Sequence, residues 1–304
     1  MRLLNASGCL DALTATDVAR SLDVFVTKTV TPLPRGGNEP VRIAETEGGM
    51  LNAIGLANPG IDRFRSEVLP QLGELGVPIW VSVGGFCTAD YANLCAALDG
   101  CDEVAVVELN LSCPNVDEVP DSVGETVAAA RKATTKPLYA KLSPAADVAD
   151  TARAAESAGA DGLSLVNTVK GLTLDERTLQ PVLERGIGGL SGPVLRPLAL
   201  AAVYACFRAT ALPIVGMGGV ATGRDALELL AAGASDLALG TVLFADPGAP
   251  GRIRSELEAE LVSVGFARAD NAVGVAHGLD HSALDPRLRV TREKSLHMGA
   301  NMAG

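Results

Sequence analysis

The sequence predicts a single (β/α)8 barrel, and three features of the chain lead to this fold class. Eight short runs rich in branched aliphatic residues recur along the 304 residues. An alanine-rich or amphipathic stretch with helical start signals lies between most of them. Strands that alternate with helices form a parallel sheet, and eight such units close a barrel. An open doubly wound sheet is the alternative, but ASGC follows the first run where a dinucleotide-binding fold has its glycine fingerprint.

The predicted strands are short and apolar, and in chain order they are Leu3–Ala6, Val24–Thr27, Ile79–Val83, Val104–Leu111, Leu138–Leu142, Gly162–Val166, Ile214–Met217 and Leu237–Leu239. Between them, Asp, Ser and Thr residues that can cap a first helical turn stand at Thr16-Asp17, Asp62, Thr88–Asp90, Asp121-Ser122, Asp147 and Thr222–Asp225. We expect one barrel domain over residues 1–265 and an irregular, charged tail over residues 266–304.

Two connections are longer than the joints that usually link strands and helices. One spans residues 28 to 60 and is rich in Pro, Gly and Asn, and the other spans residues 168 to 192. Each follows the carboxyl end of a predicted strand, which is the edge where barrel enzymes build their active sites. We therefore expect both long loops to contribute to a functional site.

Composition and charge restrict the class of function. The formal net charge is −11, and an acidic surface repels the phosphate backbone of nucleic acids. The six cysteines include no C-x-x-C pair, which predicts a reducing compartment and neither a disulfide framework nor a metal centre. The first residues lack a signal-peptide pattern, and the longest apolar run, Leu198–Phe207, is too short to cross a bilayer. We expect a cytoplasmic protein that binds neither nucleic acid nor membrane.

In a closed barrel the residues that end the strands converge on one mouth. Here they are small, amide, hydroxyl, cationic or thiol residues: Asn5 to Gly8, Lys28-Thr29, Ser82 to Gly85, Asn110 to Asn115, Lys141, Asn167-Thr168, Gly216 to Gly219 and Gly240-Thr241. Such a set suits a flat, hydrogen-bonding ligand that carries a phosphate. Gly218-Gly219 and Gly240-Thr241 match the phosphate site that barrels build after strands seven and eight, although glycine could serve only the tight turns there.

Lys28 and Lys141 interrupt strand ends whose other residues are apolar. A buried lysine needs a partner. Either residue could form a Schiff base, which requires an amine without its proton, or could act as a fixed cation beside an electron-rich ring. The fixed cation is favoured by four amides, which can hold a planar ring that has both donors and acceptors: Asn52, Asn110, Asn115 and Asn167.

The fourth predicted strand ends in the most reactive group of the chain. The run VAVVELNLSCPN over residues 104–115 places Cys113 between two amides, and Pro114 stops the strand there. A thiol at the mouth of a strand can act as a base or nucleophile. A free cysteine can also be a small buried hydrophobe, and this run alone leaves both interpretations open.

Six motifs together resemble the class 1 dihydroorotate dehydrogenases. They are GMLNAIGLANPG (49–60), ELNLSCPN (108–115), YAKLSP (139–144), LVNTVKG (165–171), GGLSGP (188–193) and VGMGGVATGRDALELL (215–230). The resemblance runs from about Asn5 to Pro247, and its motifs fall on the predicted strand ends. It is strongest to the branch whose catalytic subunit is linked to NAD.

The resemblance implies a (β/α)8 barrel with FMN at its mouth and oxidation of dihydroorotate to orotate. By position Cys113 would be the base. The substrate would be bound by Lys28, Asn52, Ala53, Ile54, Gly55, Leu56, Asn110, Asn115, Asn167 and Thr168. The flavin would be held by Ala6, Ser7, Gly8, Lys28, Thr29, Asn110, Lys141, Ser191 and Gly192, with its phosphate on Gly218, Gly219, Gly240 and Thr241.

The same resemblance implies a homodimer and a partner subunit that carries FAD and an iron–sulfur cluster to NAD. Three parts of the chain depart from the family: the loop 116–125 is short and acidic, little sequence precedes the first strand, and the C-terminal tail has no counterpart. In that tail HGLDH (277–281) has the spacing of a metal-binding pair, but we expect a solvated segment.

Three other functions fit parts of the sequence. A flavin barrel could reduce another pyrimidine ring such as uracil, and a lyase could use Lys141 as a Schiff base. A dihydrouridine synthase is also a flavin barrel with a cysteine, but the acidic composition and the lack of a basic RNA-binding region argue against it.

Overall fold

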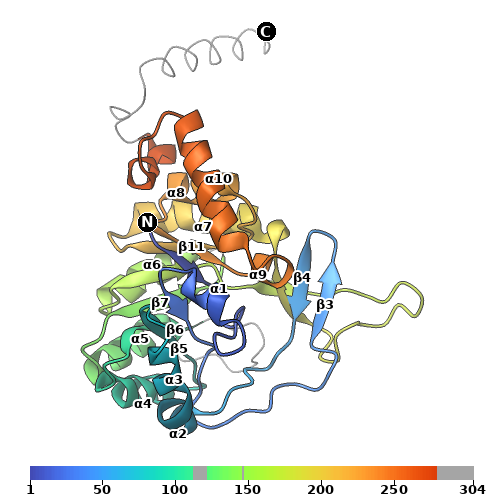
Figure 1. The fold of residues 1–304 in the computed structure, drawn as a ribbon. Helices are drawn as coiled ribbons and strands as arrows, with labels where there is room; N and C mark the ends of the chain where they lie inside the picture. The colour runs from blue at the N-terminus through green and yellow to red at the C-terminus, as the bar shows by residue number, and fades with distance from the viewer. Residues whose placement is uncertain (112–121, 146, 279–304) are drawn as a thin grey trace.

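The computed structural model describes residues 1–111, 122–145 and 147–278, which form a barrel with a small sheet at its mouth (Figure 1). Its eight-stranded sheet has the order β1-β12-β11-β8-β7-β6-β5-β2, and every paired neighbour is parallel. The strands are β1 (Leu3–Asn5), β2 (Phe25–Val26), β5 (Ile79–Val83), β6 (Val104–Asn110), β7 (Leu138–Leu142), β8 (Gly162–Leu165), β11 (Ile214–Met217) and β12 (Asp236–Leu239). Each overlaps a strand that the sequence predicts, so the predicted fold class is confirmed.

The barrel closes between β1 and β2, where the ladder is reduced to a parallel bridge between Leu4 and Val24. The fully buried side chain of Asn5 completes the seam. Its Nδ2 donates to the carbonyl oxygen of Val26 at 2.7 Å, and its Oδ1 accepts from the Val26 N–H at 2.8 Å. One amide side chain therefore supplies the pair of hydrogen bonds that a neighbouring strand would otherwise make.

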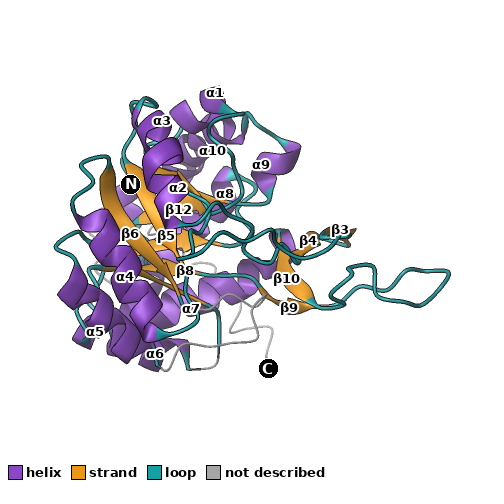
Figure 2. Cartoon of the chain, turned by 90° about the horizontal axis from the view of Figure 1, so that it is seen from below, coloured by secondary structure: helices purple, strands orange, loops and turns teal. Residues whose placement is uncertain are grey.

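Helices surround the strands and cover their outer face (Figure 2). They are α1 (Thr16–Arg20), α2 (Ile61–Arg63), α3 (Leu69–Gly73), α4 (Thr88–Asp99), α5 (Val123–Ala133), α6 (Val148–Ser157), α7 (Arg196–Ala209), α8 (Gly223–Ala232), α9 (Val242–Ala245) and α10 (Ala249–Ser263), with the short turns η1 (Phe64–Val68) and η2 (Pro193–Leu195). Two predicted starts are capped as expected: Ser122 accepts from the Glu125 N–H, and Thr222 forms a capping box with Asp225.

Two apolar cores result from the alternation of side chains along the strands. The larger core lies between the strands and the helices, and includes Leu109, Leu163 and Leu165. The smaller core fills the barrel interior around Trp80, Tyr139 and Val215. Below it Arg2 forms an ion pair with Asp236 at 2.7 Å and lies over the Trp80 ring. The end of the barrel remote from the mouth is thus filled by packed side chains.

The two long connections contain strands that were not predicted from the sequence. They contribute an antiparallel sheet of order β3-β4-β10-β9, formed by β3 (Ile43–Thr46), β4 (Gly49–Asn52), β9 (Val169–Gly171) and β10 (Gly188–Ser191). Figure 2 shows it beside the barrel mouth, with the long excursion between β9 and β10 projecting beyond it. These strands are short and rich in glycine, so their own propensity is weak, and pairing between distant segments decides their structure.

The region after α10 forms two short turns within the described residues, η3 (Ala269–Ala272) and η4 (Val275–His277). Ala272 is fully buried, and the His277 ring stacks on Tyr204 with its Nε2 2.9 Å from the Ala232 carbonyl oxygen. His281 and the rest of the tail lie outside the described residues. Among the helices of residues 1–278 that the structure describes, none has the length and apolar character needed to cross a bilayer.

The closure of the barrel can be tested at Asn5. The Asn5→Ala variant leaves the buried N–H and C=O of Val26 without their partners, so we expect the free energy of unfolding to fall by about 3 kcal/mol. Urea unfolding followed by circular dichroism measures this change. Asn93→Ala on the exposed face of α4 is the control and should change stability by less than about 0.5 kcal/mol. Equal stability of the two variants would contradict the proposed role of Asn5.

Candidate active site

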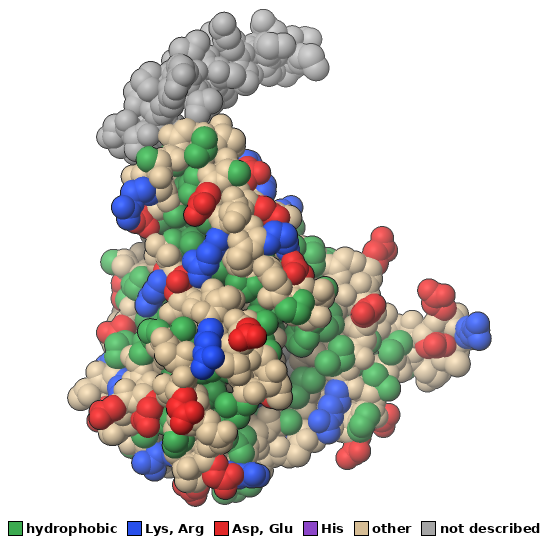
Figure 3. All heavy atoms as spheres, in the orientation of Figure 1, with side chains coloured by type: hydrophobic (Ala, Val, Ile, Leu, Met, Phe, Trp, Pro, Cys, Tyr) green, Lys and Arg blue, Asp and Glu red, His purple; other side chains and the backbone are tan. Residues whose placement is uncertain are grey.

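A cavity of about 610 Å³ lies at the carboxyl ends of the barrel strands. Its walls come from the barrel mouth and from the small sheet, including Met50 and Asn52 of β4. Figure 3 shows apolar side chains gathered where the small sheet meets the barrel. The size is that of a site for a small molecule or cofactor, and its position is where barrels carry out chemistry.

Most of the predicted site residues line this one cavity: Ala6, Ser7, Gly8, Lys28, Thr29, Asn52, Ile54, Leu56, Asn110, Lys141, Asn167, Thr168, Ser191, Gly192, Gly218, Gly219, Gly240 and Thr241. Ala53 and Gly55 do not line it. Ala53 is buried in the core of the small sheet, and Gly55 lies against Asn38. Cys113 and Asn115 lie outside the described residues.

A row of hydrogen bonds crosses one wall of the cavity. Asn167 Nδ2 donates to Asn110 Oδ1 at 2.9 Å, and Asn110 Nδ2 donates to Thr29 Oγ1 at 3.2 Å. Thr29 Oγ1 also lies 3.1 Å from Ser82 Oγ. Each amide is therefore held in one orientation by its neighbour, so that the wall presents a fixed pattern of donors and acceptors to a ligand.

Both predicted lysines reach the cavity, and one partner of Lys141 is a carboxylate. The Lys141 side chain is only 7% exposed, and its Nζ lies 3.5 Å from Glu108 Oε1 on the neighbouring strand. This bears out the expectation that a lysine buried at a strand end needs a partner. Lys28 is half-buried and lies over Gly8, where a Cβ would be 2.9 Å from Lys28 Cδ and 3.1 Å from Nζ. The two ammonium groups make the cavity suitable for anionic ligands.

The loops after β11 and β12 form a second end of the cavity, as predicted. Gly219 has φ +79°, and a Cβ there would lie 2.8 Å from the backbone nitrogen of Arg196 at the start of α7. Only glycine allows this approach. Thr241 Oγ1 donates to Ser191 Oγ at 2.9 Å and joins the β12 loop to the small sheet. Close backbone approach next to helix starts suits an anion such as phosphate.

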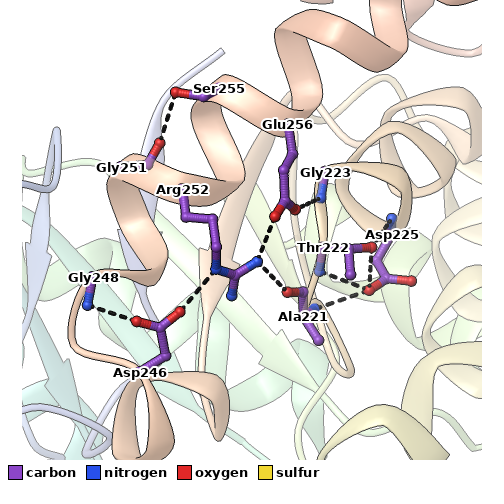
Figure 4. A network of polar contacts seen from close by, with 10 residues as sticks. All are labelled: Ala221, Thr222, Gly223, Asp225, Asp246, Gly248, Gly251, Arg252, Ser255 and Glu256. Atoms are coloured by element: carbon purple, nitrogen blue, oxygen red, sulfur yellow. Dashed lines mark hydrogen bonds and ion pairs between the residues drawn. The ribbon is translucent and has the colours of Figure 1, made fainter.

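A polar network behind these loops holds them together (Figure 4). Arg252 of α10 donates to Asp246 after α9 at 2.8 Å and to the Ala221 carbonyl oxygen after β11 at 3.1 Å. Glu256, also paired with Arg252, accepts from the Gly223 N–H at 2.8 Å. The loops that follow two different strands are thus fixed to the same helix.

Asp225 fixes the loop after β11 from the other side. Its Oδ2 accepts from the N–H groups of Ala221 and Thr222, and Arg196 forms an ion pair with its Oδ1. Burial opposes ionisation of Asp225, but these hydrogen bonds and the Arg196 charge prevail and lower its pKa. The carboxylate therefore stays charged at neutral pH.

Several residues that line the cavity escaped the sequence analysis. They are mostly apolar and include Ile43, Met50, Leu195, Met217 and Phe244, together with Cys9. Their residue types do not identify them as cavity residues, because a methionine or leucine at a strand end more often belongs to the hydrophobic core. Burial raises the pKa of the Cys9 thiol, and the nearby charges of Lys141 and Lys28 offset this only in part. Cys9 is thus a neutral wall residue.

The donor set supports a flat group with a phosphate at one end. Amides and lysines lie along one wall, apolar side chains flank the space, and a glycine cradle lies at the far end. A flavin mononucleotide has the matching chemistry, with a planar polar ring and a phosphate on a flexible chain. The residues present therefore fit such a cofactor.

The state of Cys9 can be tested by alkylation. Because burial raises the pKa of this thiol, it should remain protonated at pH 8, and iodoacetamide should modify it at least about tenfold more slowly than the exposed Cys87. Peptide mass spectrometry over a time course measures both rates in one sample. Modification of Cys9 as fast as Cys87 would show a reactive thiol in the wall.

Comparison with known proteins identifies the family of the chain. The dihydroorotate dehydrogenase family model matches residues 2–261. The chain is 42% identical over 264 residues to the catalytic subunit of dihydroorotate dehydrogenase B (NAD(+)) from Desulforudis audaxviator, covering 84% of this chain and 86% of that one. It is 40% identical to the Geobacillus kaustophilus subunit of the same name, covering 90% of each chain.

A relative from Solibacter usitatus, whose name assigns it provisionally to dihydroorotate dehydrogenase A (fumarate), is 44% identical and covers 84% of this chain and 86% of its own. Among solved structures, dihydroorotate dehydrogenase from Eimeria tenella in complex with ferulenol superposes with a TM-score of 0.76 over 91% of this chain and 85% of that one. At 22% identity it supports the fold. With the family model matched over nearly the whole barrel, this chain belongs to the dihydroorotate dehydrogenase family.

Proposed function

We propose that this chain oxidises dihydroorotate to orotate in pyrimidine biosynthesis, with FMN as its flavin and Cys113 as the base. The observation that carries the proposal is the cavity itself. Lysine and amide side chains meet on one wall, and two glycine-bearing loops meet at the other end, all in a chain whose family is flavin-dependent. The lysine and amide wall thus suits the substrate, and the glycine-bearing loops suit the phosphate of the flavin.

The flavin is assigned to the deeper part of the cavity. Thr29, Lys141 and Ser191 would hold its ring, while Gly218, Gly219, Gly240 and Thr241 would bind its phosphate through their backbone. Bound FMN supplies a two-electron acceptor for the hydride. Lys141 places a positive charge at the cavity wall, where it stabilises negative charge on the reduced ring.

The substrate is assigned to the wall formed by the hydrogen-bonded amides. Asn52, Asn110 and Asn167 can pair with the ring carbonyl and N–H groups, and Lys28 can pair with the carboxylate. Ile54 and Leu56, which line the cavity, would add backbone contacts. Asn115, two residues beyond Cys113 in sequence, would complete the set. This arrangement selects a planar, anionic pyrimidine.

The reaction needs one base and one hydride acceptor. Cys113 as thiolate would take the proton from ring carbon 5, ring carbon 6 would lose hydride to the flavin, and the carbon–carbon double bond would form between them. A thiolate above a carbon acid performs general base catalysis. In sequence Cys113 follows the end of β6 by only three residues, which supports its assignment to this site.

The Schiff-base alternative finds less support. Lys141 Nζ forms an ion pair with Glu108 Oε1 at 3.5 Å. A Schiff-base lysine acts as a nucleophile on a carbonyl, and an ion pair with a buried carboxylate does not present it for that attack. A fixed cation is therefore the better role for Lys141.

The partners and location follow from the branch that the chain resembles most. Two of the relatives are named as catalytic subunits, which implies a second subunit. We propose a homodimer of this chain in the cytoplasm, associated with a subunit that carries FAD and an iron–sulfur cluster to NAD. We propose a barrel domain of residues 1–265, and Phe266 and Ala272 of the following segment pack in its core.

The first test of this function is the colour of the protein. Purified protein should be yellow, and dihydroorotate should bleach the flavin absorbance in the absence of oxygen. The Cys113→Ala variant should retain FMN but lose the base, so its flavin should be reduced more slowly by a factor of about 100 to 10,000. Stopped-flow absorbance under anaerobic conditions measures both rates.

The exposed Cys87→Ala variant serves as the control and should behave as the wild-type protein. Reduction of Cys113→Ala at the wild-type rate would remove Cys113 as the base. Bleaching by NADPH with turnover of uracil, but none with dihydroorotate, would assign another pyrimidine as the substrate. A colourless protein that borohydride links to its substrate would support the lyase.

The electron acceptor is a separate prediction. The sequence carries no dinucleotide fingerprint, so the purified chain alone should not reduce NAD. Tagged chain isolated from its native cells should bring a subunit containing FAD and an iron–sulfur cluster, and that complex should form NADH from dihydroorotate. Rapid reoxidation of the reduced chain alone by fumarate would instead place it with the fumarate-linked enzymes.

A further inference from the structure

A buried carboxylate lies beneath the active-site cavity, and the reaction proposed above does not use it. Glu108 is on β6, faces the barrel interior, and is 1% exposed. It precedes Asn110 by two residues on the same face of the strand, so it lies about 7 Å deeper in the barrel. Asn110 lines the cavity and Glu108 does not.

The neighbouring strands surround it with polar groups. Glu108 is aligned with Ser82 of β5 and with Tyr139 of β7. Two residues nearer the mouth, Lys141 is aligned with Asn110 of β6 and with Ser164 of β8. Among the described residues, Glu108 Oε1 and Ser164 Oγ are both buried without a hydrogen-bond partner. The 3.5 Å between Glu108 Oε1 and Lys141 Nζ makes an ion pair but is too long for a charge-assisted hydrogen bond.

The ion pair is oriented with respect to the cavity. Lys141 lines the cavity and Glu108 lies on its far side, so the positive end points toward a bound ligand and the negative end points away. In a buried site with few water molecules the field of such a pair is weakly screened. Any negative charge on a ligand ring is attracted by Lys141 and, from farther away, repelled by Glu108.

We propose that Glu108 is a positioning residue that holds Lys141 at the cavity wall and sets how strongly the site favours the reduced form of its flavin. The negative charge of the carboxylate cancels part of the positive potential of Lys141 at the flavin. The reduction potential of the bound flavin is therefore lower, and the reduced flavin can still pass its electrons to an acceptor. This inference rests on the FMN role proposed above. It assigns a function to a charge that costs folding free energy to bury.

The barrel contains a second buried carboxylate that serves as a matched control. Asp236 is also inside the barrel and paired with an arginine, Arg2, but it lies at the end remote from the mouth. Replacing it by Asn removes the same charge without changing the field near the cavity. A general loss of barrel stability would follow either replacement, whereas an effect on the flavin would follow only the replacement at Glu108.

The experiment is a redox titration of the bound flavin against reference dyes. Glu108→Gln removes the negative charge and keeps the shape, so its flavin should favour the reduced form by about tenfold, which is a rise of about 30 mV for a two-electron couple. Asp236→Asn should leave the potential at the wild-type value. Glu108→Asp keeps the charge but draws it back toward β6, so it should raise the potential by a smaller amount and can replace Glu108→Gln if that variant does not fold.

Each outcome decides the proposal. An unchanged or lower potential in Glu108→Gln, or in Glu108→Asp where the first variant does not fold, would overturn it. Equal shifts in Glu108→Gln and Asp236→Asn would also overturn it, because the effect would then be general. Loss of flavin from folded Glu108→Gln alone would reduce Glu108 to a structural role. Wild-type protein that binds no FMN would refute the proposed function itself, which is a separate result.

Discussion

The whole arrangement depends on the closure of an eight-stranded parallel ring at its weakest seam. Between β1 and β2 a single bridge and the side chain of Asn5 replace a full ladder. Closure brings the carboxyl ends of strands far apart in sequence to one mouth, so the loops after β1, β2, β8, β11 and β12 share a cavity with Asn110 of β6 and Lys141 of β7. An open sheet of the same strands would spread these loops along an edge.

The barrel interior contains two ion pairs, one at the end remote from the mouth and one beside the cavity, and they have different roles. At the closed end, the Arg2–Asp236 pair and Trp80 fill space and join strand starts. Near the mouth, the Glu108–Lys141 pair lies beside the cavity, and the amide row of Asn167 and Asn110 continues along the cavity wall. The loops beyond β11 and β12 are fixed from behind by Arg252 and Asp225, and their glycines line the other end of the cavity.

Much of the fold and the cavity could be predicted from the sequence. The barrel strands are recognisable as apolar runs, and the polar residues at the ends of these runs indicate the residues that line the cavity. Lys141 was recognisable as a buried cation since its neighbours are apolar. Glu108 interrupts an equally apolar run and could have been recognised as its partner by the same reasoning. The small sheet could not, because GGLS and VKG have little strand propensity, and GGLS also pairs with GMLN, which lies more than a hundred positions away. Apolar cavity residues such as Met50 carry no local signal.

The small sheet also gives the chain an order of assembly. Asn52 of β4 lies opposite Gly189 of β10, although four of the eight barrel strands separate the two in sequence. During synthesis the N-terminal hairpin of β3 and β4 must wait until about two thirds of the chain has emerged before its partner strands exist, and pairings over such separations form slowly. The cover of the cavity is therefore among the last parts that can form. Before the small sheet forms, the mouth of the barrel is open, and a cofactor can enter the cavity. Once the small sheet has formed, it narrows this entrance.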